Sequence, residues 1–196
     1  MKKFELISEF VTNVFGKKLF RIKALVSFGD VSAGELGGFV EKEENLSNNG
    51  NAWVSGNARV SGDARVSGDA LVSGNAQVSD NAWVSGNAWV SGDARVSGDA
   101  LVSGNARVSG NAQVSGNADF SVVTGFGRCF RATTFFRCKD KILRVQCGCF
   151  YGDLAKFREI VKKTHGDSKY AKEYLAIADL MELHFSDEEE NQEADK

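Results

Sequence analysis

The chain has 196 residues, of which 42% are hydrophobic and 26% are charged, and its formal net charge is −2. This length allows one to three small units and excludes a large multidomain enzyme. The small net charge does not favour binding to a nucleic acid backbone, and no apolar run approaches the roughly 18 residues of a membrane-spanning helix. The N-terminus lacks a signal-peptide core, so we expect a cytoplasmic protein with reduced cysteines.

Residues 1–50 are expected to form a cap of β-hairpins. Apolar and polar residues alternate over residues 4–7, 10–14 and 19–24. Residues 15–18 include a glycine and are typical of a turn. Residues 41–45 are predicted to form a helical turn that leads into the next segment. Such a cap is required because an open sheet end would otherwise pair with other chains.

A six-residue phrase, Asx-Ala-x-Val-Ser-Gly, repeats from Asn51 to Ala118 and predicts a parallel β-solenoid. Successive side chains of a strand point to opposite sides, so Ala and Val of each phrase share one side and the residue x has the other. Ala and Val are apolar throughout and face inward, whereas x varies in polarity and faces outward. Ser-Gly-Asx forms the corner, because Gly and Asx tolerate positive φ.

Charge stacking indicates how many phrases form one coil, because equivalent residues of neighbouring coils lie about 4.8 Å apart. Stacking at six residues would place Arg59 on Arg65, and stacking at twelve would place Arg95 on Arg107. Stacking at eighteen leaves no like-charged neighbours among the x and Asx positions. The sequence therefore favours triangular coils of three phrases, nearly four coils over residues 51–120, with no room inside for a ligand.

The phrase resembles the hexapeptide-repeat, left-handed parallel β-helix class, in which a small residue stands two positions before an aliphatic one, as Ala52 does before Val54. Left-handedness is implied by this resemblance alone. The flanks are similar to a narrower family of mostly uncharacterised phage and prophage proteins with Asn-Ala-x-Val repeats. The similar flanking segments are residues 36–47, 133–137, 147–150 and 164–167.

Residues 121–186 are expected to form a C-terminal module of two strands and two helices. The predicted strands are residues 130–137 and 142–150, with a turn at 139–141. Asp153 can cap the first helix, and Asp167 or Ser168 the second. The residues predicted to face inward are Leu154, Phe157, Ile160 and Val161 in the first helix, and Tyr170, Tyr174, Ile177, Leu180 and Met181 in the second. The acidic tail, residues 187–196, is predicted to be disordered and solvated, with contact to a basic partner as the alternative.

Stacking at eighteen residues sorts the outward residues into three faces. Face one carries Trp53, Leu71, Trp89 and Arg107; face two carries Arg59, Gln77, Arg95 and Gln113; face three carries Arg65, Trp83, Leu101 and Asp119. Face two is either a solvated polar ladder or a surface for an anionic partner. Faces one and three expose apolar stripes that monomers rarely leave bare, so we expect the C-terminal module or another chain to cover them.

The predicted surface for a partner or for self-association comprises Trp53, Arg59, Arg65, Leu71, Trp83, Trp89, Arg95 and Leu101. A dimer or trimer is expected, because the residues after the repeat can hardly shield two separate faces.

The sequence contains no evident catalytic, cofactor or metal site. Hexapeptide acyltransferases are similar in fold and use a histidine beside the prism as a base, but the only histidines here, His165 and His184, follow the repeat. The cysteines, Cys129, Cys138, Cys147 and Cys149, lack the paired spacing of a zinc site and are interpreted as structural thiols. Cys147 and Cys149 would share one face of a strand. A nucleophilic pair of Cys147 with His165 requires that the fold join them.

These observations predict a non-catalytic binding protein, encoded by a phage or prophage, whose rigid prism holds or blocks a macromolecular host partner. One role of this kind is the antagonism of a host antiviral defence system. The alternatives are a hexapeptide-repeat acyltransferase and a structural or assembly protein.

Overall fold

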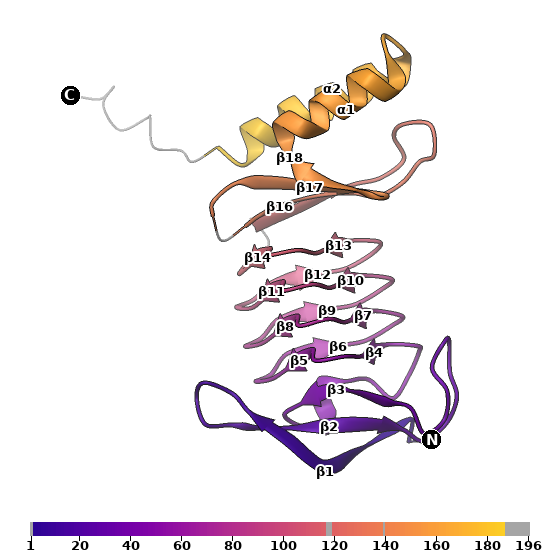
Figure 1. Cartoon of the computed structure of the whole chain (residues 1–196), viewed down its shortest axis with the longest axis vertical. Coiled ribbons are helices and arrows are strands. Elements are labelled where there is room, and N and C mark those ends of the chain that lie inside the picture. The colour runs from indigo at the N-terminus through magenta and orange to yellow at the C-terminus, as the bar shows by residue number, and fades with distance from the viewer. Residues whose placement is uncertain (1, 117–118, 139, 187–196) are drawn as a thin grey trace, which may run out of the picture.

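The computed structural model describes residues 2–116, 119–138 and 140–186, which form one column with the repeat in its middle (Figure 1). Antiparallel strands β1 (Phe4–Thr12), β2 (Lys18–Ala24) and β3 (Leu36–Val40) close the N-terminal end. A second antiparallel sheet and two helices close the other end. No helix in the described ranges is long and apolar enough to cross a membrane. The protein is thus a parallel β-solenoid between two caps.

Each phrase of the repeat contributes one two-residue strand, formed by x and Val. The strands are β4 (Trp53–Val54), β5 (Arg59–Val60), β6 (Arg65–Val66), β7 (Leu71–Val72), β8 (Gln77–Val78), β9 (Trp83–Val84), β10 (Trp89–Val90), β11 (Arg95–Val96), β12 (Leu101–Val102), β13 (Arg107–Val108) and β14 (Gln113–Val114). Each strand from β4 to β11 pairs in parallel with the strand three phrases later, as Trp53 does with Leu71. The result is three ladders, β4-β7-β10-β13, β5-β8-β11-β14 and β6-β9-β12. The prediction of three phrases per coil is confirmed.

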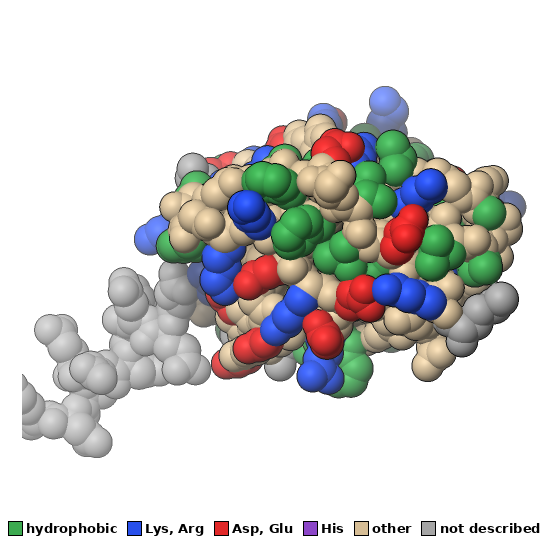
Figure 2. All heavy atoms as spheres, turned by 90° about the horizontal axis from the view of Figure 1, so that it is seen from below, with side chains coloured by type: hydrophobic (Ala, Val, Ile, Leu, Met, Phe, Trp, Pro, Cys, Tyr) green, Lys and Arg blue, Asp and Glu red, His purple; other side chains and the backbone are tan. Residues whose placement is uncertain are grey.

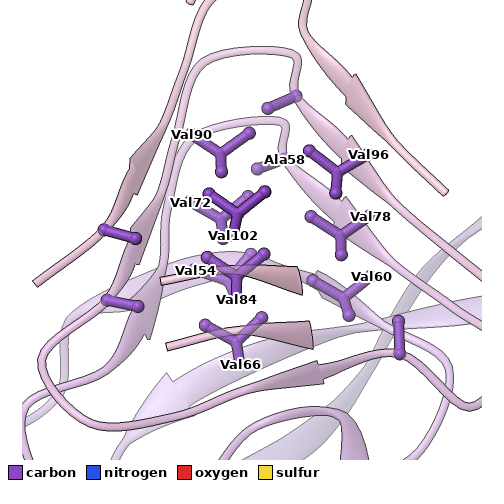
Figure 3. Packing of buried hydrophobic residues seen from close by; sticks show 14 of the residues in the cluster. Val54, Ala58, Val60, Val66, Val72, Val78, Val84, Val90, Val96 and Val102 are labelled. Atoms are coloured by element: carbon purple, nitrogen blue, oxygen red, sulfur yellow. The ribbon is translucent and has the colours of Figure 1, made fainter. Parts of the chain in front are cut away.

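The core of the solenoid consists of the valines and alanines of the phrases, whose exposed fraction is 0–1%. Figure 3 shows valines of all three ladders, among them Val72, Val84 and Val96, gathered around one axis. Main-chain hydrogen bonds join neighbouring coils, for example from the Arg59 N–H to the Ala76 carbonyl (2.9 Å). Each coil therefore satisfies the backbone of the next one while it buries a thin apolar core.

The corners explain why the phrase contains Ser-Gly-Asx. Gly86 has φ +66°, and a Cβ added there would lie 2.9 Å from the backbone nitrogen of Gly104 in the next coil. Asx side chains form ladders along the corners, with Asn75 Nδ2 donating to Asp93 Oδ1 (3.0 Å). An amide thus meets a carboxylate, which accounts for the absence of stacked like charges. Asp80, the one break in the Ser-Gly pairs, also has a positive φ of +61°.

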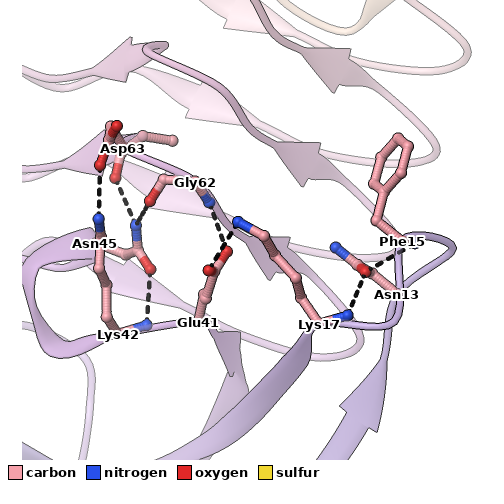
Figure 4. Close-up of polar contacts among 9 residues, drawn as sticks. Asn13, Phe15, Lys17, Glu41, Lys42, Asn45, Gly62 and Asp63 are labelled. Atoms are coloured by element: carbon pink, nitrogen blue, oxygen red, sulfur yellow. Dashed lines mark hydrogen bonds and ion pairs between the residues drawn. The ribbon is translucent and has the colours of Figure 1, made fainter.

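The N-terminal cap extends the ladder of face two, because β3 pairs in parallel with β5 while β2 and β1 follow antiparallel. A 3-10 helix, η1 (Glu43–Asn45), confirms the predicted helical turn. Asn45 Nδ2 donates to the carbonyls of Gly62 (3.1 Å) and Ala64 (2.8 Å), in the place of main-chain donors from a further coil (Figure 4). Figure 2 shows the outer end of this cap, where hydrophobic, basic and acidic side chains are intermixed.

Four antiparallel strands, rather than the two predicted, cover the C-terminal end of the solenoid. They are β15 (Phe120–Val123), β16 (Thr133–Arg137), β17 (Leu143–Cys147) and β18 (Phe150–Asp153). The predicted strand 142–150 is divided because Gly148, with φ +59°, reverses the chain. Phe136 packs into the core of the solenoid and Phe135 into the core beneath the helices, since neighbouring residues of a strand point to opposite faces.

Helices α1 (Leu154–His165) and α2 (Lys169–His184) cover the outer face of this sheet (Figure 1). Asp153 caps α1, as predicted, and Ser168 caps α2. In α1 the buried residues are Leu154, Phe157 and Val161, and in α2 they are Ala171, Tyr174, Ile177, Ala178 and Met181. The prediction that Tyr170 and Leu180 face inward is wrong, because both lie outside this buried face and are exposed. The predicted acidic tail lies outside the described residues.

Candidate partner-binding surface

Each predicted face corresponds to one parallel ladder of the solenoid. Asp119 does not extend face three, because its carboxylate accepts the N–H groups of Ser115 (2.8 Å) and Gly116 (3.1 Å) where the chain leaves the solenoid. The C-terminal module covers the end of the prism rather than its sides (Figure 1). Four large apolar residues therefore remain exposed on the sides, namely Leu71, Trp83, Trp89 and Leu101.

Trp53 is not part of this exposed surface, and its prediction as a partner-binding residue is wrong. Its side chain is only 2% exposed, because the segment between β2 and β3 folds over it and places the Phe28 ring 5.4 Å away, edge to face. Its indole nitrogen is buried without a hydrogen-bond partner among the described residues. The phrase around Trp53 is identical to those around Trp83 and Trp89, so the repeat itself gave no sign of this difference.

Face three carries an open groove, the face-three groove, of about 550 Å³ between η1 and Trp83. It is lined by Glu43, Glu44, Leu46, Ser47, Asn48, Arg65, Val66, Ser67 and Trp83. Trp83 is 49% exposed, and its Nε1 donates to Ser67 Oγ (2.9 Å), so the indole has a fixed orientation. Leu101 follows Trp83 in the same ladder and is also exposed. The groove thus combines an oriented aromatic wall with charges of both signs.

Face one carries two exposed apolar side chains. Leu71 and Trp89 are neighbours in its ladder and both are exposed. Trp89 Nε1 donates to Ser73 Oγ (3.0 Å). This hydrogen bond is equivalent to the one between Trp83 and Ser67. The guanidinium of Arg107 lies 5.6 Å from the centroid of the Trp89 ring, in a cation–π contact that covers one side of the indole.

Face two is polar and carries Arg59, Gln77 and Arg95 beneath the tip of the β1–β2 hairpin, where they line a groove of about 250 Å³. Arg59 is partly buried there, whereas Arg95 is exposed. Glu41, at the same groove, accepts the Gly62 N–H (2.8 Å) and pairs with Lys17 (3.0 Å), as Figure 4 shows. These contacts lower the pKa of the Glu41 carboxyl, chiefly through the backbone hydrogen bond.

The C-terminal module contains a separate hollow of about 280 Å³, the cysteine pocket. It is lined by Arg128, Cys129, Arg131, Cys147, Cys149, Phe150, Phe157, Ile160, Val161, Thr164, His165 and Tyr174. The fold therefore brings Cys147 and His165 into one pocket. Cys147 ends β17 and Cys149 follows the Gly148 turn, so the prediction that both cysteines share one face of a strand is wrong.

No hydrogen bond joins Cys147 to His165 within the described residues. Cys147 Sγ instead accepts from Thr133 Oγ1 (3.2 Å), and the His165 ring lies 5.8 Å from the ring of Tyr174. Burial, together with the neighbouring Cys147 thiol, raises the pKa of Tyr174 to about 12. No group of three or more His, Cys, Asp or Glu side chains in the described ranges could hold a metal ion. The pocket thus has polar groups at its rim but no assembled catalytic pair.

Comparison with known families identifies the repeat but not the caps. Five segments match a family model described as the YdcK Beta solenoid repeat, namely residues 52–66, 64–78, 76–92, 94–110 and 102–116. No curated protein matched the chain. The matched segments lie within the solenoid, and their ladders agree with a solenoid repeat. The chain is therefore a β-solenoid repeat protein whose coils are similar to the YdcK solenoid repeat.

Proposed function

We propose that the protein is a non-catalytic binding protein whose solenoid holds or blocks a macromolecular partner through face three. Trp83 is the observation that supports this most strongly. It is half exposed in the middle of face three, it is oriented by its hydrogen bond to Ser67, and the face-three groove opens beside it. Tryptophan and arginine are the residue types that dominate binding hot spots, and Arg65 precedes Trp83 in the same ladder.

Rigidity supports this function. The Trp83 backbone is hydrogen-bonded to the next coil through Ala100, and its side chain is already oriented, so a partner loses little entropy in ordering it. Trp83 and Leu101 form an apolar centre, while Glu43, Glu44 and Arg65 surround it with charge. An apolar centre with a polar rim is the usual arrangement of protein–protein interfaces.

The mixed charges at the face-three groove favour a protein partner over a nucleic acid. A nucleic acid site requires a predominantly basic surface that neutralises phosphates. The carboxylates of Glu43 and Glu44 would repel phosphates, and Arg65 is the one basic residue in the described lining of the groove. Because the flanking segments resemble those of phage and prophage proteins, we propose a protein of a host antiviral defence system as the partner.

We further propose that face one mediates a homo-oligomer, a dimer or a trimer. Leu71 and Trp89 are adjacent exposed apolar side chains of this ladder, and stripes of this kind are rarely left in water. Light scattering should report a multiple of the chain mass for the wild type and the single-chain mass for Leu71→Arg. A monomeric wild type at micromolar concentration would reject self-association and leave the assignment of face three unaffected.

The two alternative functions have less support. The repeat contains no histidine, so an acyltransferase would need a base from outside the solenoid. Both ends of the solenoid are covered, by β1–β3 and by β15–β18, so stacking of solenoids end to end would have to displace a cap. A thermal shift caused by acetyl-CoA would favour the acyltransferase, and filaments seen by electron microscopy would favour an assembly protein.

The partner can be identified by capture on the tagged full chain from a bacterial lysate. We expect one protein or complex at a stoichiometric amount, retained in high salt because its contact with Trp83 is apolar. The matched control is Trp83→Ala, which removes an exposed side chain and should not alter folding. Equal capture of the same proteins by wild type and Trp83→Ala would count against face three.

A further inference from the structure

We propose that the cysteine pocket is a second binding site, separate from the solenoid surface, for a small amphipathic carboxylate with an aliphatic body. The pocket lies between α1, α2, the β17–β18 turn and the segment before β16. Its volume of about 280 Å³ is near the lower limit for ligand pockets, so it suits a compact ligand rather than a nucleotide or a peptide.

The floor of the cysteine pocket is apolar. Phe150 and Phe157 meet there with their ring centroids 5.5 Å apart, and Ile160 and Val161 line the pocket from α1. Phe157 and Val161 belong to the buried core of the module, so this part of the floor is fixed by the fold. Such a surface favours a hydrocarbon body, because burying it there removes apolar area from water.

The rim of the pocket is positively charged. Arg128 and Arg131 line it, and no Asp or Glu is among its described lining residues. Both arginines are exposed to solvent. The Arg131 guanidinium lies against the β17–β18 turn, since a Cβ added at Gly148 would be 2.6 Å from its NH1. Two arginines in the lining of a hollow with an apolar floor fit an anionic head with an apolar tail, because a carboxylate can accept hydrogen bonds from both guanidiniums.

A neutral donor completes the head-group site. Tyr174 is buried except for 7% of its surface, and its side chain lines the pocket. A tyrosine hydroxyl is protonated at neutral pH and can donate to a carboxylate, and burial raises the pKa of Tyr174 further. The thiols serve as reporters of occupancy, since Cys147 is half buried in the same pocket.

The test uses the full chain with sodium octanoate as the probe, in isothermal titration calorimetry. We expect one octanoate per chain with a dissociation constant on the order of 0.1–1 mM, given its size. Octanol and octyltrimethylammonium, which share the hydrocarbon chain but not the negative charge, should bind at least about tenfold more weakly. The double variant Arg128→Gln/Arg131→Gln should lose octanoate affinity by a similar factor.

Two further measurements keep the result interpretable if the double variant does not fold. Ile160→Trp should fill the floor and abolish octanoate binding, whereas Ile142→Trp, an exposed isoleucine of the same module outside this pocket, should not. Octanoate should also slow alkylation of Cys147 by iodoacetamide in the wild type. Absence of saturable binding, equal binding of octanol, or unchanged alkylation would overturn the proposal. None of these readouts depends on the solenoid partner, so the two proposals fail separately.

Discussion

The coils of the solenoid are filled by valine and alanine, whereas the C-terminal module is filled by aromatic side chains such as Phe135, Phe157 and Tyr174. In the solenoid, each coil is held by main-chain hydrogen bonds to the next coil. Its corner glycines lie so close to the backbone of the next coil that a Cβ would be crowded there. In the module, the sheet and helices meet over a few large residues, and a hollow remains between them. Substitutions at the inward and corner positions should therefore destabilise the solenoid, whereas the outward positions x can vary. A binding surface can develop at these outward positions.

The largest expected effect is that of Val84→Asp. Val84 is fully buried, and a carboxylate there would have no partner, so it should cost several kcal/mol and unfold a domain of ordinary stability. The control is Gln77→Asp, which places the same side chain at an exposed x position of the same coil and should be nearly neutral. Denaturant unfolding followed by circular dichroism measures both. A folded Val84→Asp chain with unchanged melting would contradict the inward assignment.

The two cores can be separated at neighbouring residues of β16. Phe136→Ala and Phe135→Ala should each cost about 3–5 kcal/mol, because both side chains are fully buried. Phe136→Ala should increase amide hydrogen exchange in the last coils of the solenoid. Phe135→Ala should increase it in α1 and α2 while the central coils keep their protection. Identical exchange patterns for the two variants would show that the module and the solenoid share one core.

The corner glycines offer a matched pair. Gly86 and Gly104 both have φ +66°, but a Cβ at Gly86 would meet the next coil, whereas one at Gly104 has no atom of the described residues within 4 Å. Alanine at Gly104 should cost about 1–2 kcal/mol for the left-handed backbone alone. Alanine at Gly86 should cost more, because the coils must also move apart. Equal midpoints in urea would mean that close coil approach does not limit the corner sequence.

A smaller effect concerns Lys3 in the N-terminal cap. Lys3 is buried, donates to the Ala52 carbonyl (2.8 Å), and has its pKa lowered to about 8 by desolvation. Between pH 8 and 10.5, the ordinary pKa of a lysine, the unfolded chain holds this proton and the folded chain does not. Stability should therefore rise with pH in that window, by the linkage between proton binding and folding. Lys3→Met should lack this rise, and an equal rise in both proteins would exclude Lys3 as its source.

The solenoid could be predicted closely because its sequence repeats the same physical constraint many times. Charge stacking at Arg59, Arg65 and Arg95 was enough to select three phrases per coil, and the ladders confirm it. The burial of Trp53 could not be predicted, since its phrase is identical to that of Trp83 and only the contact with the cap distinguishes the two residues. A periodic pattern fixes which way a side chain points, but it does not determine what lies above it.

The caps were predicted less well because they rely on single residues. Gly148 alone divides the expected strand 142–150, and it separates Cys147 from Cys149. The face-three groove forms because η1 lies beside Arg65 and Ser67. Ser67 is a corner serine, and its sequence position does not distinguish it from the other corner serines. No local sequence pattern predicts the contact of η1 with these two residues. The proximity of Cys147 and His165 likewise depends on how α1 lies on the sheet.

The central claim, that function resides on the exterior of the solenoid, is tested most directly by quantifying partner capture for three folded variants beside the wild type. Arg65→Ala/Trp83→Ala should lose most of the capture, and Arg59→Ala/Arg95→Ala, on face two, should weaken it less. His165→Ala, in the C-terminal module, should capture as much as the wild type. Loss of capture in His165→Ala with retention in Arg65→Ala/Trp83→Ala would contradict the claim and assign the function to the module.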